Sequence, residues 1–190
     1  CIKKIMGLRF LNYSTHVKTT SHINLAHDFK EVLEKLSQAN NTSELTQVSQ
    51  HFLQDTFGIP LRKIGLCIRS TNAYSRDTQT CCNKLQNIVE HMLRTENQEI
   101  NAYIKQHRIL IYDEVEFSNF YEENEVRQEL LIFLNSLNAE LFIPIFNKDR
   151  IISYIIIENH DRAREFYGTV ERDEMIIFAS YLNHIITLLQ

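Results

Sequence analysis

Apolar and polar residues follow two different periods along this chain, which together predict a mixture of helices and strands. In some segments apolar residues recur every three or four positions, the spacing of a helix with one face in a core. Shorter runs that are apolar throughout and bounded by polar residues indicate buried strands. The expected elements are helices near residues 28–39, 45–58, 84–104, 126–137 and 169–190, and strands near 61–70, 109–112, 141–146 and 151–157.

The two longest strand candidates predict a hairpin with two apolar faces. A strand with one face in water alternates apolar and polar residues, but Leu141–Phe146 and Ile151–Ile157 are apolar almost throughout. Both faces of the sheet are therefore expected to be covered. Together with the order of elements, this predicts an α+β fold that has a central, mostly antiparallel sheet with helices on both faces.

The hairpin and the last helix resemble parts of a known family. AELFIPIFNKDRIISYIIIENHD, residues 139–161, resembles the late strands of a GAF domain, and FYGTVERDEMIIFASYLNHIITLL, residues 166–189, is similar to its closing helix. The resemblance implies a GAF-like sensory domain over residues 27–190, whose last helix leads to an output module beyond this sequence. Residues 1–26 are then an N-terminal connecting segment.

The resemblance also implies a small-molecule pocket between the sheet and residues 84–137. We expect the hairpin to turn at Lys148–Asp149, which pairs Asn147 with Arg150, Ile145 with Ile152, and Ile143 with Tyr154. Ser153 then faces the terminal helices, while the Tyr154 face looks toward the middle of the chain. The expected pocket and lid residues are Tyr154, Ile143, Ile156, Phe117, Phe120, Tyr121 and Tyr112. The alternative is that these side chains fill a core and leave no pocket.

The ligand and cofactor of such a pocket are unknown from the sequence. The asparagine-lysine-phenylalanine-aspartate-glutamate set of cyclic-nucleotide-binding GAF domains cannot be traced here. Cys82 is followed by Asn83 instead of the His of bilin-binding members. Neither ligand is therefore expected.

The last helix is apolar on more of its circumference than one contact with a sheet requires, because a stripe only somewhat over 100° wide is enough. One stripe passes through Phe178, Leu182, Ile185 and Leu189. A second passes through Met175, Ala179 and Ile186, which we expect to form the interface of a homodimer through the terminal helices. The alternative is a helix buried between two layers of one domain.

Charge and composition exclude several function classes. Acidic residues are concentrated between 113 and 129, which disfavours nucleic-acid binding. The sequence contains no apolar stretch of membrane-spanning length and no signal peptide, so we expect a cytoplasmic protein. The eight histidines form no helical i, i+4 pair beside a Cys, and no metal site is expected.

The sequence contains no phosphate-binding glycine loop, GxSxG elbow or HExxH motif, so this domain is not expected to be an enzyme. Some GAF-like proteins are thiol reductases, which makes Cys67, Cys81 and Cys82 the candidates for the less favoured enzyme hypothesis. The chain opens on Cys1, and we expect it to be a piece of a longer protein.

The prediction is therefore a bacterial signal-transduction domain, from a histidine kinase of a two-component system or a transcription regulator. It would bind a small molecule and dimerise. The alternative is a ligand-free dimerisation or protein-docking domain.

Overall fold

The computed structural model describes residues 25–68, 83–93, 97–117, 125–159 and 167–189. The chain divides into two compact units, residues 1–34 and residues 35–190. Of the first unit, only residues 25–34 are described, and they belong to helix α2 (Leu25–Ser37). The second unit contains all the other described elements.

Helix α3 (Thr42–Phe57) of the second unit begins and ends at local sequence signals. It follows Asn41, whose Oδ1 accepts a hydrogen bond from the Glu44 N–H at 2.9 Å, and it ends at Gly58 with a φ of 69°. A 3₁₀ turn, η1 (Leu61–Lys63), leads into the first strand. The remaining helices are α4 (Asn83–Met92), α5 (Gln98–His107), α6 (Tyr112–Phe117), α7 (Glu125–Ser136) and α8 (Thr169–Leu189).

The four described strands form one antiparallel sheet. They are β1 (Ile64–Ile68), β2 (Leu110–Ile111), β3 (Ala139–Asn147) and β4 (Arg150–Glu158), in the order β1-β4-β3-β2. The expected α+β class and antiparallel sheet are confirmed. The strand expected at 109–112 is shorter than predicted, because Tyr112 already begins α6.

The hairpin turns where the sequence predicts, but its register changes close to the turn. Asn147 pairs with Arg150, as expected. Ile145, however, pairs with Ser153, so Ile152 is left opposite no residue in a β-bulge. The expected pairing of Ile143 with Tyr154 is therefore wrong: Tyr154 pairs with Pro144.

The bulge changes which side chains share a face of the sheet. Side chains of residues directly opposite one another lie on the same face. Tyr154 therefore lies with Pro144, and Ile143 lies on the opposite face with its partner Ile155. The Tyr154 face still meets the middle of the chain, as predicted.

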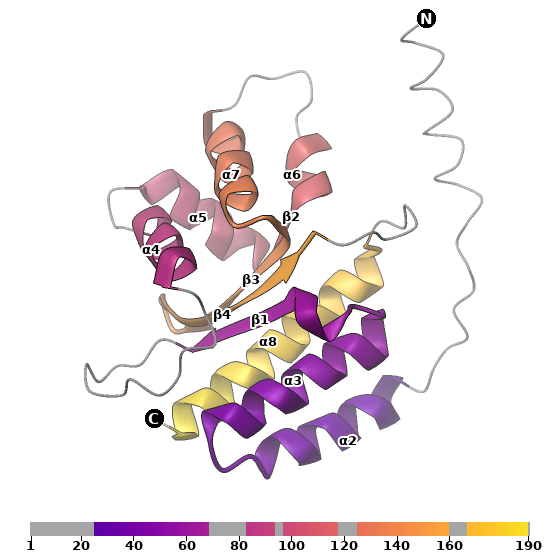
Figure 1. Ribbon diagram of the computed structural model, residues 1–190. Coiled ribbons are helices and arrows are strands. Elements are labelled where there is room, and N and C mark those ends of the chain that lie inside the picture. The colour runs from indigo at the N-terminus through magenta and orange to yellow at the C-terminus, as the bar shows by residue number, and fades with distance from the viewer. Residues whose placement is uncertain (1–24, 69–82, 94–96, 118–124, 160–166, 190) are drawn as a thin grey trace, which may run out of the picture. The chain divides into compact units, whose positions relative to one another are not determined.

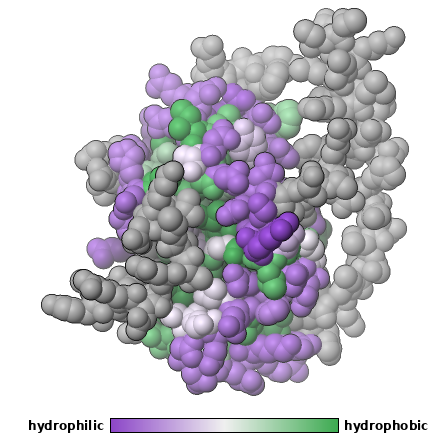
Figure 2. Space-filling model, in the orientation of Figure 1, coloured by the Kyte–Doolittle hydropathy of each residue, from purple (hydrophilic) through white to green (hydrophobic). Residues whose placement is uncertain are grey.

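Helices cover both faces of the sheet, as Figure 1 shows. Helices α3 and α8 lie along one face, where the Phe52 and Phe178 rings pack with centroids 4.4 Å apart. Helices α4, α5 and α7 lie on the other face. In Figure 2, hydrophilic residues occupy much of the visible described surface, with hydrophobic ones between them. The fully apolar hairpin is explained by this two-sided cover.

Candidate functional site

The Tyr154 face, where the pocket was expected, is filled by side chains. Tyr154 is fully buried, and its ring lies 5.6 Å from that of Phe142, which packs edge-on against Phe133 at 5.1 Å between centroids. Helices α4, α5 and α7 supply the rest of this cluster. Its buried members are Cys67, Val89, Ile100, Ile104, Leu110, Val115, Leu130, Phe133, Leu134, Leu137, Ala139, Phe142, Tyr154 and Ile156. These described side chains pack as a core.

The structure brings together only some of the residues expected to line the pocket. Tyr154 and Ile156 belong to the buried cluster, and Tyr112 packs at its margin. Ile143 lies on the other face of the sheet, because the bulge at Ile152 shifts the register. Phe120 and Tyr121 lie outside the described residues.

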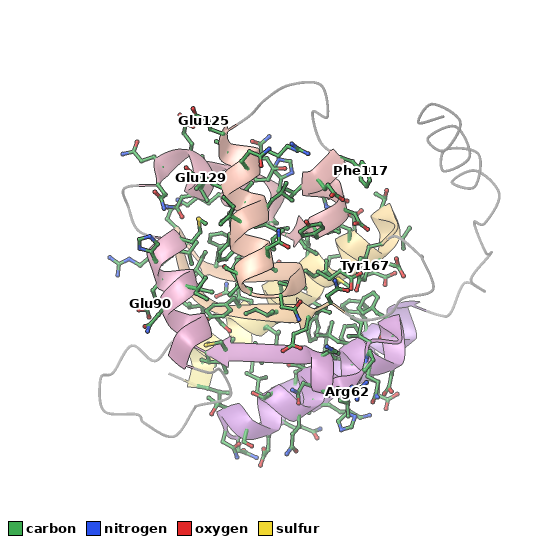
Figure 3. All side chains as sticks on the ribbon, turned by 45° about the horizontal axis from the view of Figure 1, so that its top comes forward. Arg62, Glu90, Phe117, Glu125, Glu129 and Tyr167 are labelled. Carbon is green, nitrogen blue, oxygen red and sulfur yellow. The ribbon has the colours of Figure 1, made fainter. Side chains whose placement is uncertain are left out.

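Phe117 ends helix α6 and is 50% exposed. Figure 3 shows it on α6, with Glu125 and Glu129 on the neighbouring α7. A lid residue would be buried over the pocket it closes. Half of the Phe117 side chain is instead exposed in this arrangement.

The second apolar stripe of α8 is buried inside the chain. Met175, Ala179 and Ile186, the expected dimer residues, are 6% exposed or less. In the arrangement described, these side chains pack within the core of their own chain, so their burial gives no support to a dimer interface at these residues.

A different set of apolar residues on α8 is exposed. Val170, Ile177, Tyr181 and Leu188 are between 43% and 73% exposed. At 100° per residue, these four fall within about 40° of one another around the helix axis. We call them the outer stripe. The prediction missed them, although their spacing of seven, four and seven residues was visible in the sequence.

The outer stripe stands out among the exposed apolar residues of the described chain. It contains four of the six large hydrophobic side chains that are exposed there, the others being Phe117 and Ile132. Single exposed apolar residues are ordinary, but a line of them along one helix indicates an interaction surface.

Ionisable groups surround the beginning of α8. The Arg172 Nη1 lies 3.3 Å from a Glu114 carboxylate oxygen, and its Nη2 donates to the His107 carbonyl oxygen at 3.3 Å, which joins α8 to α6 and α5. The His107 ring stacks on Tyr103 with centroids 4.0 Å apart. Burial, followed by the charge of Arg172, lowers the pKa of His107, and Glu114 opposes this shift.

Glu174 lies on α8 between the outer stripe and the buried side and is itself almost completely buried. Burial raises the pKa of its carboxyl group, and the negative charge of Glu171 adds to the shift. The folded chain therefore favours the protonated, neutral form of Glu174 more than an unfolded chain does.

The described residues contain little that points to catalysis or metal binding. Cys67 is buried in the middle of β1, whereas Cys81 and Cys82 lie outside the described residues. Within the described ranges, no group of three or more His, Cys, Asp or Glu residues could hold a metal ion. No described helix is long and apolar enough to cross a membrane.

No protein-family model matches the chain, and no curated protein sequence matches it.

Proposed function

We propose that this chain is a regulatory domain of a signal-transduction protein, with a GAF-like fold, that forms a homodimer through the outer stripe of α8. The observation that carries the proposal is the line of exposed apolar residues at Val170, Ile177, Tyr181 and Leu188. The antiparallel sheet with helices on both faces supports the GAF-like part, together with the resemblance of the hairpin and the last helix.

The spacing of the outer stripe suits a parallel pair of helices. Val170, Ile177, Tyr181 and Leu188 fall on alternating steps of four and three residues when Glu174 and His184 are included. This is the a and d pattern of a two-stranded coiled coil. Around a two-fold axis, each stripe residue would meet its own copy. Glu174 is almost completely buried in its own chain, so the exposed His184 is the polar position that would fix the register at some cost in stability.

The proposal gives the domain a role without a ligand in its core. The packed Tyr154 face favours the ligand-free alternative over a small-molecule sensor with a pocket at that place. Regulation would then act on the equilibrium between one and two copies, or between two arrangements of the paired helices. An effector shifts such an equilibrium only by as much as it discriminates between the two states.

The test is the oligomeric state of matched variants. In Ile177→Asp, a charge enters the centre of the outer stripe, and we expect sedimentation equilibrium to show a monomer where the unchanged chain is a dimer. Ile132→Asp is the matched control, since Ile132 is also an exposed isoleucine on a helix, 66% exposed on α7.

Two results would contradict the proposal. One is an unchanged chain that stays monomeric at every concentration examined. The other is a dimer that survives Ile177→Asp with its affinity intact. If both Ile variants dissociate, the effect is not specific to the outer stripe.

A further inference from the structure

A crevice at the edge of the sheet shares Pro144 with the Tyr154 face but contains no residue of the outer stripe. It encloses about 150 Å³ between the end of α5, strand β3 and helix α8. Strand β2 pairs only with Leu141 and Phe142, so no described strand covers β3 beyond that point on this side. The crevice is lined by Arg108, Pro144, Phe146, Ile176, Ala179, Ser180 and Asn183.

Arg108 occupies a position where its backbone is strained. It follows the last residue of α5 with a φ of 64°, and its N–H donates to the Ile104 carbonyl oxygen at 2.9 Å. Glycine or asparagine is usual at this left-handed position after a helix, because a larger side chain costs free energy there. An arginine that keeps such a backbone is a candidate for a functional role.

The Arg108 side chain gives the crevice its only full charge. The guanidinium carbon lies 5.0 Å from the centre of the Phe146 ring, which holds the planar group by a cation–π contact. None of the other six lining residues is ionised. Within the described part of the chain, no carboxylate forms an ion pair with Arg108.

The remaining walls combine a second donor with apolar surface. The Thr187 hydroxyl donates to the Asn183 carbonyl oxygen at 2.8 Å, and the Asn183 side-chain amide, which has both a donor and an acceptor, lines the crevice. Pro144, Phe146 and Ala179 present carbon to the crevice. A guest held here would therefore meet hydrogen-bond donors at one end and apolar side chains along its body.

We infer that this crevice binds a small monocarboxylate with a compact apolar body, of about the size of benzoate. The guanidinium fork matches the two oxygens of a carboxylate. A cavity of about 150 Å³ holds a benzene-sized molecule. One cation beside apolar walls suits a singly charged organic acid better than a phosphate, which needs more donors. The inference stands independently of the proposed homodimer.

The test is an NMR titration of the whole chain with sodium benzoate. We expect saturable shifts of the amide signals of Phe146, Ala179 and Asn183. Benzamide, which has the same shape without the charge, and inorganic phosphate, which has charge without an apolar body, should bind about tenfold more weakly or not at all.

Variants separate recognition by Arg108 from general attraction of anions. Arg108→Gly removes the side chain and suits the left-handed backbone, so the fold is kept while benzoate binding is lost. Arg108→Asn, which also tolerates this backbone, is the second variant should the first not fold. Lys148→Gly is the matched control, because Lys148 is a cation at φ 55° that does not line the crevice. It should bind benzoate as the unchanged chain does.

Four results would overturn the inference. They are the absence of saturable benzoate shifts in the unchanged chain, equal binding of benzamide, equal binding of phosphate, and benzoate binding that persists in Arg108→Gly or Arg108→Asn.

Discussion

Two residues on α8 provide a strict test of which side of this helix belongs to the core. Met175 is 0% exposed, and Ile177, two positions later, is 48% exposed. Truncation to alanine at each position removes a similar amount of side chain from the same helix. The two variants therefore differ mainly in the surroundings that each side chain loses.

The expected effects on stability follow from burial. Met175→Ala removes a fully buried side chain and leaves a cavity, which typically costs about 2–5 kcal/mol of unfolding free energy. For a chain of this size, that loss lowers the melting temperature by about 4–20 °C. Ile177→Ala removes a side chain from the surface and should change the unfolding free energy of the monomer by less than about 0.5 kcal/mol.

The assay is urea denaturation followed by circular dichroism, at several protein concentrations. Concentration matters because association stabilises the folded state and would make the Ile177→Ala midpoint depend on it differently from that of the unchanged chain. The denaturant slope should stay constant, since neither variant alters how much surface unfolding exposes.

The reasoning fails if the two variants exchange their effects. A Met175→Ala protein that unfolds like the unchanged chain but no longer associates would mean that Met175, Ala179 and Ile186 form the interface after all. It would also mean that the outer stripe faces the core in solution.

Three further predictions concern single ionisable or strained residues. Glu174→Gln should raise the unfolding free energy near pH 7. The raised pKa of Glu174 favours folding only at low pH, and this contribution is lost as the pH rises from 4.5 through the raised value. Urea denaturation between about pH 4 and 8 should show an unfolding free energy that depends less on pH in the variant. His107→Phe, which keeps the ring stack on Tyr103, should remove a loss of stability that sets in as the pH falls below 6.5. This loss is expected because the lowered pKa of His107 makes the folded chain bind protons more weakly than the unfolded chain. A loss of stability that persists in the variant would come from another group. Lys148→Gly should raise the melting temperature, because glycine adopts the φ of 55° in the hairpin turn without strain. The strain of about 1–2 kcal/mol exceeds the entropy cost of glycine, about 0.5–1 kcal/mol, so a small net gain is expected. An unchanged or lower melting temperature would contradict the strain argument.

Local signals in the sequence predicted the parts of the fold that depend on neighbouring residues. The hairpin turn and its first pair, Asn147 with Arg150, follow from a short polar turn between two apolar runs. Gly58 ends α3 as a glycine at a helix end predicts. The two-sided cover of the sheet followed from the absence of alternation.

The register beyond the first pairs could not be predicted, because Ile151 and Ile152 are both apolar and either could continue the ladder. Only the packing of the whole sheet selects Ile152 as the bulged residue. That single choice moved Ile143 from the expected pocket to the opposite face.

The burial of the residues expected at the dimer interface could not be predicted for a related reason. Apolar residues follow one another so densely in α8 that the pattern does not rank its stripes, and only contact with the sheet decides that Met175 is buried and Ile177 exposed. Likewise, whether aromatic side chains line a cavity or fill it depends on how closely α5 and α7 approach Tyr154, which is a property of packing.

The short β2 strand also has a consequence for colloidal behaviour. A sheet edge with unpaired backbone groups can add a strand from another molecule and begin an aggregate. Strand β3 has no described neighbour on its outer side from Ile143 onward, yet this edge contains Pro144, which has no N–H to donate. The hairpin tip that follows carries Lys148, Asp149 and Arg150, which would lose hydration if a like edge approached. Pro144 and the three charged residues of the turn thus make the open edge of β3 a poor template for strand addition by another molecule.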